Sequence, residues 1–287
     1  MRNIKLILEY DGSGFFGFQK QPGRPTIQEN LERALTKLLN RPSKIKGASG
    51  RTDAGVHAAC QTVHFKTDSK LSPAKIQTGL NALLPPSIAV TGIEEAPADF
   101  HARFSPSNKT YLYQIWNHPV RSPLKSAWSY HVPQPLSLTK MRQASKFLIG
   151  RLDFSSFCAS DPAKKEKEKR SNVRCLKRLE IQKRGSLIQI EIQADGFLYH
   201  MVRNIVGSLI QVGQGKRDPK EVAQVLAARD RRKAGPTAPA HGLILKAVTY
   251  LSQKAYETRG RGVAGRSGRR PLKFKKGRGK SLLMAAR

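Results

Sequence analysis

The fold class is decided by one stretch of the chain, CLKRLEIQKRGSLIQIEIQADG at residues 175–196. Apolar and polar residues alternate through two runs of this stretch, which is typical of strands with one buried face. Arg184-Gly185 separates the two runs by a turn of hairpin length, so residues 175–195 predict a pair of antiparallel strands. This hairpin argues against an all-parallel sheet.

Strands and helices alternate on both sides of the hairpin. Hydrophobic periodicity predicts strand, helix, strand, helix and strand at 4–10, 26–40, 61–67, 72–86 and 88–97. Thr26 is the expected cap of the first helix, and Pro73 lies in the first turn of the second. A similar order recurs after residue 108, with a strand at 109–117, a helix at 138–150, the hairpin, and a helix at 197–213. The sequence therefore predicts two α+β halves of like topology.

The charge balance predicts a polyanionic partner. The 287 residues include 52 Lys or Arg against 20 Asp or Glu, a net charge of +32, which favours nucleic acid or an anionic membrane surface. No apolar run approaches the roughly 20 residues needed to cross a bilayer. The apolar run within residues 1–12 is also too short for a signal peptide. Nucleic acid is therefore the expected partner.

Three cysteines, Cys60, Cys158 and Cys175, are odd in number and widely spaced. This distribution argues against a disulfide framework and against paired CxxC zinc ligation. We therefore expect a protein of the reducing cytoplasm.

Two segments have the composition of solvated chain. Residues 163–170, AKKEKEKR, have no apolar face and predict an exposed loop. Residues 252–287 hold 12 Lys or Arg and one acid, about +11, and predict a disordered basic tail. The rest of the chain keeps about +21 of the +32, so the folded body is basic as well.

One acid stands out in this basic chain, Asp53 in the turn ASGRTDAGVHA at residues 48–58. An aspartate before Ala-Gly commonly accepts backbone N–H groups in an Asx turn, and this structural role stays open. Arg51, two residues away, can keep the carboxylate ionised and oriented, as a nucleophile requires. Gly50 and Gly55 leave room for a backbone or a base to approach closely. Because a carboxylate repels phosphate, its presence here favours a chemical role.

Five blocks, in order along the chain, resemble the tRNA pseudouridine synthase A family. They are EYDGSGFFGFQ (9–19), GRTDAGVHA (50–58), DFHARFSPSNKTYLY (99–113), FLYHMVRNIVGSL (197–209) and LAARDRRKAGPTAPAHGLIL (226–245). The resemblance covers about residues 3–250. It implies isomerisation of uridine to pseudouridine at positions 38, 39 and 40 of the tRNA anticodon stem-loop. It also implies a homodimer and no metal or organic cofactor.

We accordingly predict an α+β fold of two similar ferredoxin-like or RRM-like lobes, whose mixed, largely antiparallel sheets are joined around a central catalytic cleft. The expected N-terminal lobe is 1–107 and carries the catalytic Asp. The C-terminal lobe is 108–251, and the tail is 252–287.

The resemblance also assigns roles to individual residues. It makes Asp53 the nucleophile that adds covalently to the uridine, whether at the base or at the sugar. Tyr111 matches the active-site tyrosine whose ring packs on the target base; without the resemblance it would be an ordinary strand aromatic. Arg51 and Arg203 match basic positions of the cleft and are expected to hold Asp53 and bind the RNA backbone. Arg203, taken alone, could equally be a helix-surface arginine.

Other polar residues are interpreted more plainly. His57, His64, His200 and His241 are expected to be structural, and the His and Cys positions lack the HxE and PCxxC spacing of zinc deaminases. Lys109 stands where many relatives carry arginine, so a point charge replaces a planar guanidinium there.

Two other function classes remain open at this stage. A non-catalytic RNA-binding module or a ribosome-associated basic protein would also be strongly basic, but neither would need Asp53. The K/R-G-F/Y-G/A-F-V-x-F/Y run of an RNA recognition motif is absent from the sequence.

Overall fold

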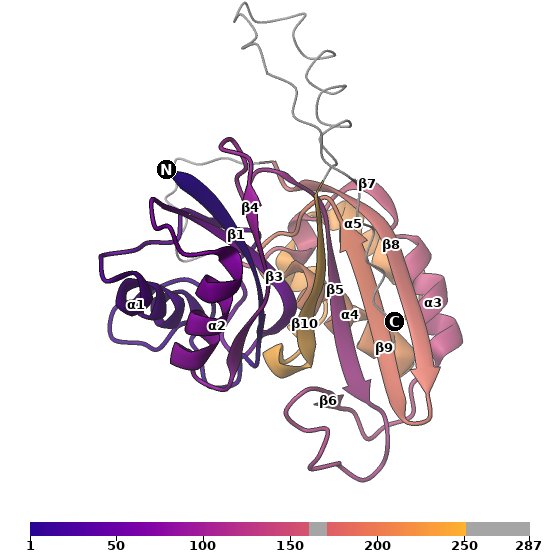
Figure 1. Cartoon of the computed structure of the whole chain (residues 1–287). Helices are drawn as coiled ribbons and strands as arrows, with labels where there is room; N and C mark the ends of the chain where they lie inside the picture. Colours follow the sequence, from indigo (N-terminus) through magenta and orange to yellow (C-terminus); the bar gives the residue numbers. More distant parts are fainter. Residues whose placement is uncertain (161–170, 251–287) are drawn as a thin grey trace, which may run out of the picture. The chain divides into compact units, whose positions relative to one another are not determined.

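The computed structural model, in which residues 1–160 and 171–250 can be described, is built on one ten-stranded sheet (Figure 1). Eight of its strands follow the order β4-β1-β3-β10-β5-β9-β8-β7, while β2 pairs with β3 and β6 with β5. Neighbouring strands are antiparallel except β10 beside β3 and β6 beside β5. The predicted α+β class with a largely antiparallel sheet is therefore confirmed. The predicted loop at 163–170 and the tail at 252–287 lie outside the described residues.

The elements before residue 100 follow the predicted order, with one addition, the two-residue strand β2, which was not predicted. They are β1 (Arg2–Tyr10), α1 (Ile27–Leu39), β2 (Gly47–Ala48), β3 (His57–Thr67), α2 (Pro73–Leu83) and β4 (Ile88–Ala96). The cap of α1 is the predicted one, because the Thr26 side chain accepts the Glu29 N–H. Pro73 is the first residue of α2, where its missing N–H costs no hydrogen bond.

The second half contains more elements than the sequence predicted. They are β5 (Pro106–Trp116), β6 (Tyr130–His131), α3 (Leu138–Lys146), β7 (Gly150–Asp153), β8 (Val173–Arg184), β9 (Leu187–Ala194), α4 (Met201–Gly213), α5 (Glu221–Ala228) and β10 (Leu243–Tyr250). The described part of the second half also contains short 3₁₀ helices at Ser155–Phe157, Arg231–Lys233 and Ala240–Gly242. The hairpin β8–β9 is the predicted one, with Arg184 paired to Leu187 across its turn.

Three predicted helices are longer than the observed ones, and the first of them, expected at 72–86, is Pro73–Leu83. The helix expected at 138–150 ends at Lys146, and Gly150, with φ of 117°, starts strand β7 instead. The helix expected at 197–213 begins only at Met201, because His200 has the left-handed φ of 57°. Left-handed residues cannot continue a right-handed helix, so residues 197–200 form a separate approach to α4.

Strand β10 connects the two halves of the sheet. It runs parallel to β3 and antiparallel to β5, so Leu245 pairs with Ala58 on one side and with Tyr111 on the other. Helix α4 packs against α3, and all but two of its thirteen residues are buried. This arrangement brings the turn before β3, strand β5 and the start of α4 to one place.

Candidate active site

Asp53 lies in the turn between β2 and β3, and glycines after β1 fit closely against this turn. A Cβ atom at Gly12 would come within 2.1 Å of the Val56 carbonyl oxygen. A Cβ atom at Gly17, which has φ of 87°, would come within 2.6 Å of the Thr52 carbonyl oxygen. Only glycine permits such close backbone approach. The glycine-rich block at 9–19 therefore supports the turn that carries Asp53.

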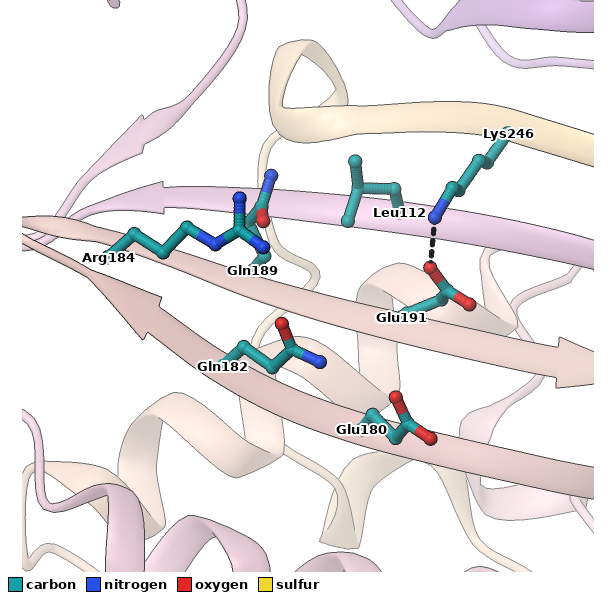
Figure 2. Close-up of a pocket in the computed structure, with 7 residues that line it drawn as sticks. All are labelled: Leu112, Glu180, Gln182, Arg184, Gln189, Glu191 and Lys246. Carbon is teal, nitrogen blue, oxygen red and sulfur yellow. Dashed lines mark hydrogen bonds and ion pairs between the residues drawn. The ribbon is translucent and has the colours of Figure 1, made fainter. Parts of the chain in front are cut away.

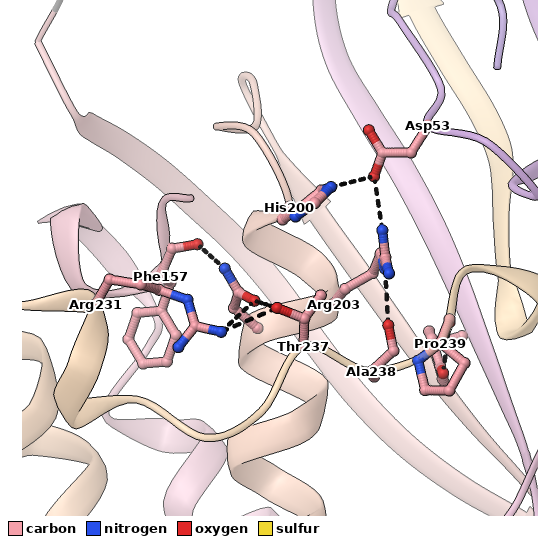
Figure 3. Close-up of polar contacts among 10 residues, drawn as sticks. Asp53, Phe157, His200, Arg203, Arg231, Thr237, Ala238 and Pro239 are labelled. Atoms are coloured by element: carbon pink, nitrogen blue, oxygen red, sulfur yellow. Dashed lines mark hydrogen bonds and ion pairs between the residues drawn. The ribbon is translucent and has the colours of Figure 1, made fainter. Parts of the chain in front are cut away.

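Two side chains at the start of α4 contact the Asp53 carboxylate (Figure 3). Its Oδ2 accepts a hydrogen bond from Arg203 Nη1 at 3.1 Å and lies 3.3 Å from His200 Nε2. The second oxygen, Oδ1, has no hydrogen-bond partner within residues 1–160 and 171–250. The Asp53 side chain is 21% exposed. One oxygen is therefore held in place while the other is open to a reacting group.

Arg203 is fixed from its other side by the segment 234–239. Its Nε donates to the Ala238 carbonyl oxygen at 2.7 Å, and the Ala238 N–H donates to the Arg203 carbonyl oxygen at 3.1 Å. The guanidinium thus spans from a backbone carbonyl to the carboxylate of Asp53 (Figure 3). The Arg203 side chain is held at both the Ala238 carbonyl oxygen and the Asp53 carboxylate, so it has little rotational freedom.

A polar cluster beneath Arg203 holds this segment. Arg231 Nη2 donates to Asn204 Oδ1 and to Thr237 Oγ1, both at 2.9 Å, and the Thr237 hydroxyl donates to Asn204 Oδ1 at 2.7 Å. Asn204 is fully buried and donates from Nδ2 to the Phe157 carbonyl oxygen at 2.8 Å. Buried polar groups with all partners present specify one arrangement.

The same segment also packs on the backbone of α4. A Cβ atom at Gly207 would come within 1.7 Å of the Pro236 carbonyl oxygen. The Gly235 N–H donates to Ser208 Oγ at 2.8 Å. Gly207 therefore allows the segment to lie directly on the helix.

Tyr111 comes from β5 and is buried near Asp53. Its ring packs edge-on against Phe197, with centroids 5.0 Å apart. Its hydroxyl approaches Gly50, where an added Cβ atom would lie 3.7 Å from Oη. Burial, with the nearby Asp53 charge, raises the pKa of Tyr111 well above its usual range. The phenol is therefore neutral at physiological pH.

The structure brings together Asp53, Tyr111 and Arg203, but it does not place Arg51 against the carboxylate. Arg51 is exposed and makes no side-chain hydrogen bond or ion pair with any described residue. The expectation that Arg51 holds Asp53 is therefore wrong in this structure. The side chain of a residue two positions away in a turn need not point back to it, and Arg203 from α4 makes the contact instead.

His200 is a site residue that the sequence interpretation missed. It was expected to be structural, yet its ring reaches Asp53 because the backbone turns left-handed at this position. Its place three residues before Arg203 was the only signal available. His57, by contrast, holds distant segments of the chain together, with ring nitrogens 3.1 Å from the Gly12 nitrogen and from the Ala127 and His241 carbonyl oxygens.

A shallow pocket on the sheet belongs to a different surface (Figure 2). It is lined by Leu112, Glu180, Gln182, Arg184, Gln189, Glu191 and Lys246. Leu112 follows Tyr111 on β5, and successive strand residues point to opposite faces. The pocket therefore faces away from Asp53. Its central carboxylate, Glu191, is paired with Lys246 and Arg178.

The described residues contain no cluster of three or more His, Cys, Asp or Glu that could hold a metal ion. Among those same residues, none of the helices is long and apolar enough to span a bilayer.

Comparison with known proteins identifies the class to which this fold and site belong. The sequence pattern described as tRNA pseudouridine synthase matches residues 6–105 and 144–251. This chain belongs to that family, whose members are isomerases acting on uridine in tRNA.

The curated relatives match over nearly their whole length. A protein of Brevibacillus brevis named tRNA pseudouridine synthase A is 44% identical over 250 residues, covering 87% of this chain and 100% of the relative. A protein of the same name from Chromobacterium violaceum is 46% identical over 259 residues, covering 89% and 96%. The Geobacillus kaustophilus protein of that name is 44% identical over 250 residues, covering 87% and 95%.

Proposed function

We propose that this chain isomerises uridine to pseudouridine at positions 38, 39 and 40 of the tRNA anticodon stem-loop, with Asp53 as the nucleophile. The observation that carries the proposal is the Asp53 carboxylate, which is held through Oδ2 and open at Oδ1. A carboxylate placed beside a cationic RNA-binding surface weakens binding, so its retention indicates a role in the reaction.

The proposed reaction exchanges one bond to the sugar for another. The N1–C1′ glycosidic bond of uridine breaks, the base rotates while detached, and a C5–C1′ bond forms. The C5 hydrogen leaves as a proton and N1 gains one, so atoms and electrons balance. Asp53 adds covalently to the uridine during the exchange, and this bond breaks again before product release, with the electron pair returning to the carboxylate. The uridine must leave its stack to reach Asp53.

The other site residues receive positioning roles in this proposal. Arg203 orients the Asp53 carboxylate through its 3.1 Å hydrogen bond. Tyr111 packs its ring on the target base and, because its pKa is raised, offers a neutral hydroxyl rather than a phenolate base. Arg51 is exposed beside Asp53, and its guanidinium is free to bind an RNA phosphate.

The choice of the anticodon arm rests on the family and on charge. The relatives above carry the name tRNA pseudouridine synthase A. Three adjacent target positions cannot share one fixed base sequence, so the proposed recognition relies on the shape of the arm and on an extrudable uridine. The net charge of +32 supplies the backbone contacts.

We also propose the larger-scale assignments. Residues 1–107 and 108–251 act as two lobes of a homodimeric cytoplasmic enzyme, with 252–287 as a basic extension. The division into two lobes is supported by the origin of the site residues. Asp53 comes from residues 1–107, while Tyr111, His200 and Arg203 come from residues 108–251. No disulfide links the described residues, which suits a reducing compartment.

Tritium release from tRNA labelled at uracil C5 tests the activity directly. The wild-type protein should release tritium and leave pseudouridine at positions 38–40, whereas an RNA-binding protein releases none. Product at distant uridines with none in the anticodon arm would contradict the proposed substrate position.

Asp53→Asn tests the nucleophile. The amide removes the nucleophile and the repulsion together, so we expect no tritium release with tRNA affinity unchanged or tighter. More than a few per cent of wild-type turnover would overturn the assignment of Asp53.

A further inference from the structure

Lys109 directs its ammonium toward the candidate active site. It lies two residues before Tyr111 on β5, so both side chains leave the same face of the strand. A Cβ atom at Gly50 would lie 3.9 Å from Lys109 Nζ and 3.7 Å from Tyr111 Oη. The ammonium and the hydroxyl therefore approach the same point, three residues before Asp53. The Gly50 carbonyl oxygen is fixed there by Gln61 Nε2 at 2.7 Å.

Within residues 1–160 and 171–250, no carboxylate forms an ion pair with the Lys109 ammonium. Its ammonium makes no hydrogen bond or ion pair with a residue in the described part of the chain, and the charges that act on it are those of Arg103 and Arg174. Burial, together with these two arginines, lowers the pKa of Lys109 to about 8. Arg174 is itself oriented by the Ser171 and Val173 carbonyl oxygens at 2.8 and 2.7 Å.

A half-buried cation among like charges is costly to the free protein, and a bound anion removes that cost. We propose that Lys109, with Arg103 and Arg174, forms a phosphate-binding subsite for the RNA backbone next to the uridine that enters the site. The inference rests on the proposed function. It adds that this side of the site binds a phosphate of the RNA backbone. An RNA phosphodiester is favoured over a free phosphate ion because the subsite adjoins the point that the nucleophile must reach.

The first test compares Lys109→Met with Lys246→Met. Lys246 lies on the neighbouring strand β10, and its charge is paired with Glu191 in the pocket on the other face (Figure 2). We expect Lys109→Met to weaken tRNA binding about tenfold and to lower the slope of log K against log salt by about one. Lys246→Met should have a smaller effect on both the tRNA affinity and the salt slope. Equal effects of the two variants on affinity and slope would overturn the proposal.

Thermal unfolding separates this loss from misfolding. Removing the unpaired charge should leave the melting temperature of Lys109→Met equal to or above that of the wild type. A large fall in melting temperature, or a fall in the saturating rate with unchanged affinity, would show that Lys109 has a structural or chemical role instead.

The pH dependence of binding has a defined sign. Lys109 is charged below pH 8 and neutral above it, so wild-type affinity should fall between pH 7 and 8.5 more steeply than that of Lys109→Arg, whose guanidinium stays charged. The same RNA is used for both proteins, so titration of its bases cancels. Identical pH profiles would contradict the proposal.

Single methylphosphonate linkages in an anticodon-arm RNA locate the phosphate. Removing the phosphate charge at one linkage near the target uridine should weaken binding of the RNA to the wild type. The same change should cause little further loss of affinity for Lys109→Met. Additive losses at every linkage would overturn the RNA assignment, and competition by inorganic phosphate that is lost in Lys109→Met would assign the subsite to the free ion. Failure of wild-type tritium release would refute the proposed function instead, whatever these binding results.

Discussion

A single backbone torsion places His200 against Asp53. The φ of 57° at this residue belongs to the left-handed region, which costs a non-glycine residue about 1–2 kcal/mol. The ring stacks on Tyr199 with centroids 3.9 Å apart and ends 3.3 Å from Asp53 Oδ2. The fold therefore maintains an unfavourable conformation that delivers an imidazole to the carboxylate.

We expect His200→Ala to slow single-turnover pseudouridine formation at saturating tRNA about tenfold, because one of the two contacts that orient Asp53 is lost. tRNA affinity should change less than twofold. His200→Gln, which keeps a hydrogen-bond donor, should recover part of the rate. His118→Ala removes an exposed histidine after β5 and serves as the control. Wild-type rates in both His200 variants would show that the contact has no influence on the reaction.

The sequence singled out Asp53 as the lone acid in a basic turn, whereas Tyr111 and Arg203 were predicted only through the family resemblance, and the structure brings the three together. Local reasoning from the turn chose Arg51 as the partner of Asp53 because it is near in sequence. The structure selects Arg203, 150 residues away, which no local pattern can reveal. The contact of His200 with Asp53 was not predicted, because neither composition nor hydrophobic periodicity indicates a left-handed φ at a histidine.

At the scale of elements, the contact between α4 and segment 234–239 determines where Arg203 points. We expect Gly207→Ala to lower the free energy of unfolding by about 1–3 kcal/mol, since its Cβ would lie 1.7 Å from the Pro236 carbonyl oxygen. The rate should fall as well, because Ala238 must shift with the segment. Denaturant unfolding and single-turnover rates measure the two effects.

Gly213→Ala is the matched control on the same helix. A Cβ atom there would meet only side-chain atoms, Met141 Sδ at 2.8 Å and Leu136 Cδ2 at 3.1 Å, which can adjust more easily than backbone. Alanine also favours a helix over glycine by about 1 kcal/mol. An equal loss in both variants would mean that backbone crowding at Gly207 has no special effect.

The sequence predicted some elements well and missed others, because only some of them have a local sequence pattern. The five predicted elements before residue 100 and the β8–β9 hairpin were found because their hydrophobic periodicity is regular and their caps are local. Strands β2 and β7 were not predicted, since strands of two and four residues have no periodicity of their own, and the first residue of β7, Gly150, was placed in the preceding helix. The parallel pairing of β10 with β3 joins residues far apart in sequence, and local patterns contain no information about it.

At the scale of the whole molecule, charge outside the described fold should influence encounter with tRNA but not the reaction. Deleting 252–287 removes about 11 positive charges. We expect single-turnover rates at saturating tRNA to stay within about twofold of wild type, while affinity at low salt weakens and the salt slope becomes shallower. Measurements at three salt concentrations test both. A large fall in the saturating rate with an unchanged slope would mean that this segment contributes to the site.

The position of β10 has a consequence for synthesis of the protein. Asp53 is made early, but β10 is the last described strand of the chain, and only β10 fills the place between β3 and β5. Until residues 243–250 leave the ribosome, the nascent chain presents two open strand edges, which are sites for mispairing with other chains. Asp53 and Arg203 therefore come together in the completed sheet only after residues 243–250 have been made, so a chain truncated before β10 would hold the Asp53 turn without an assembled site.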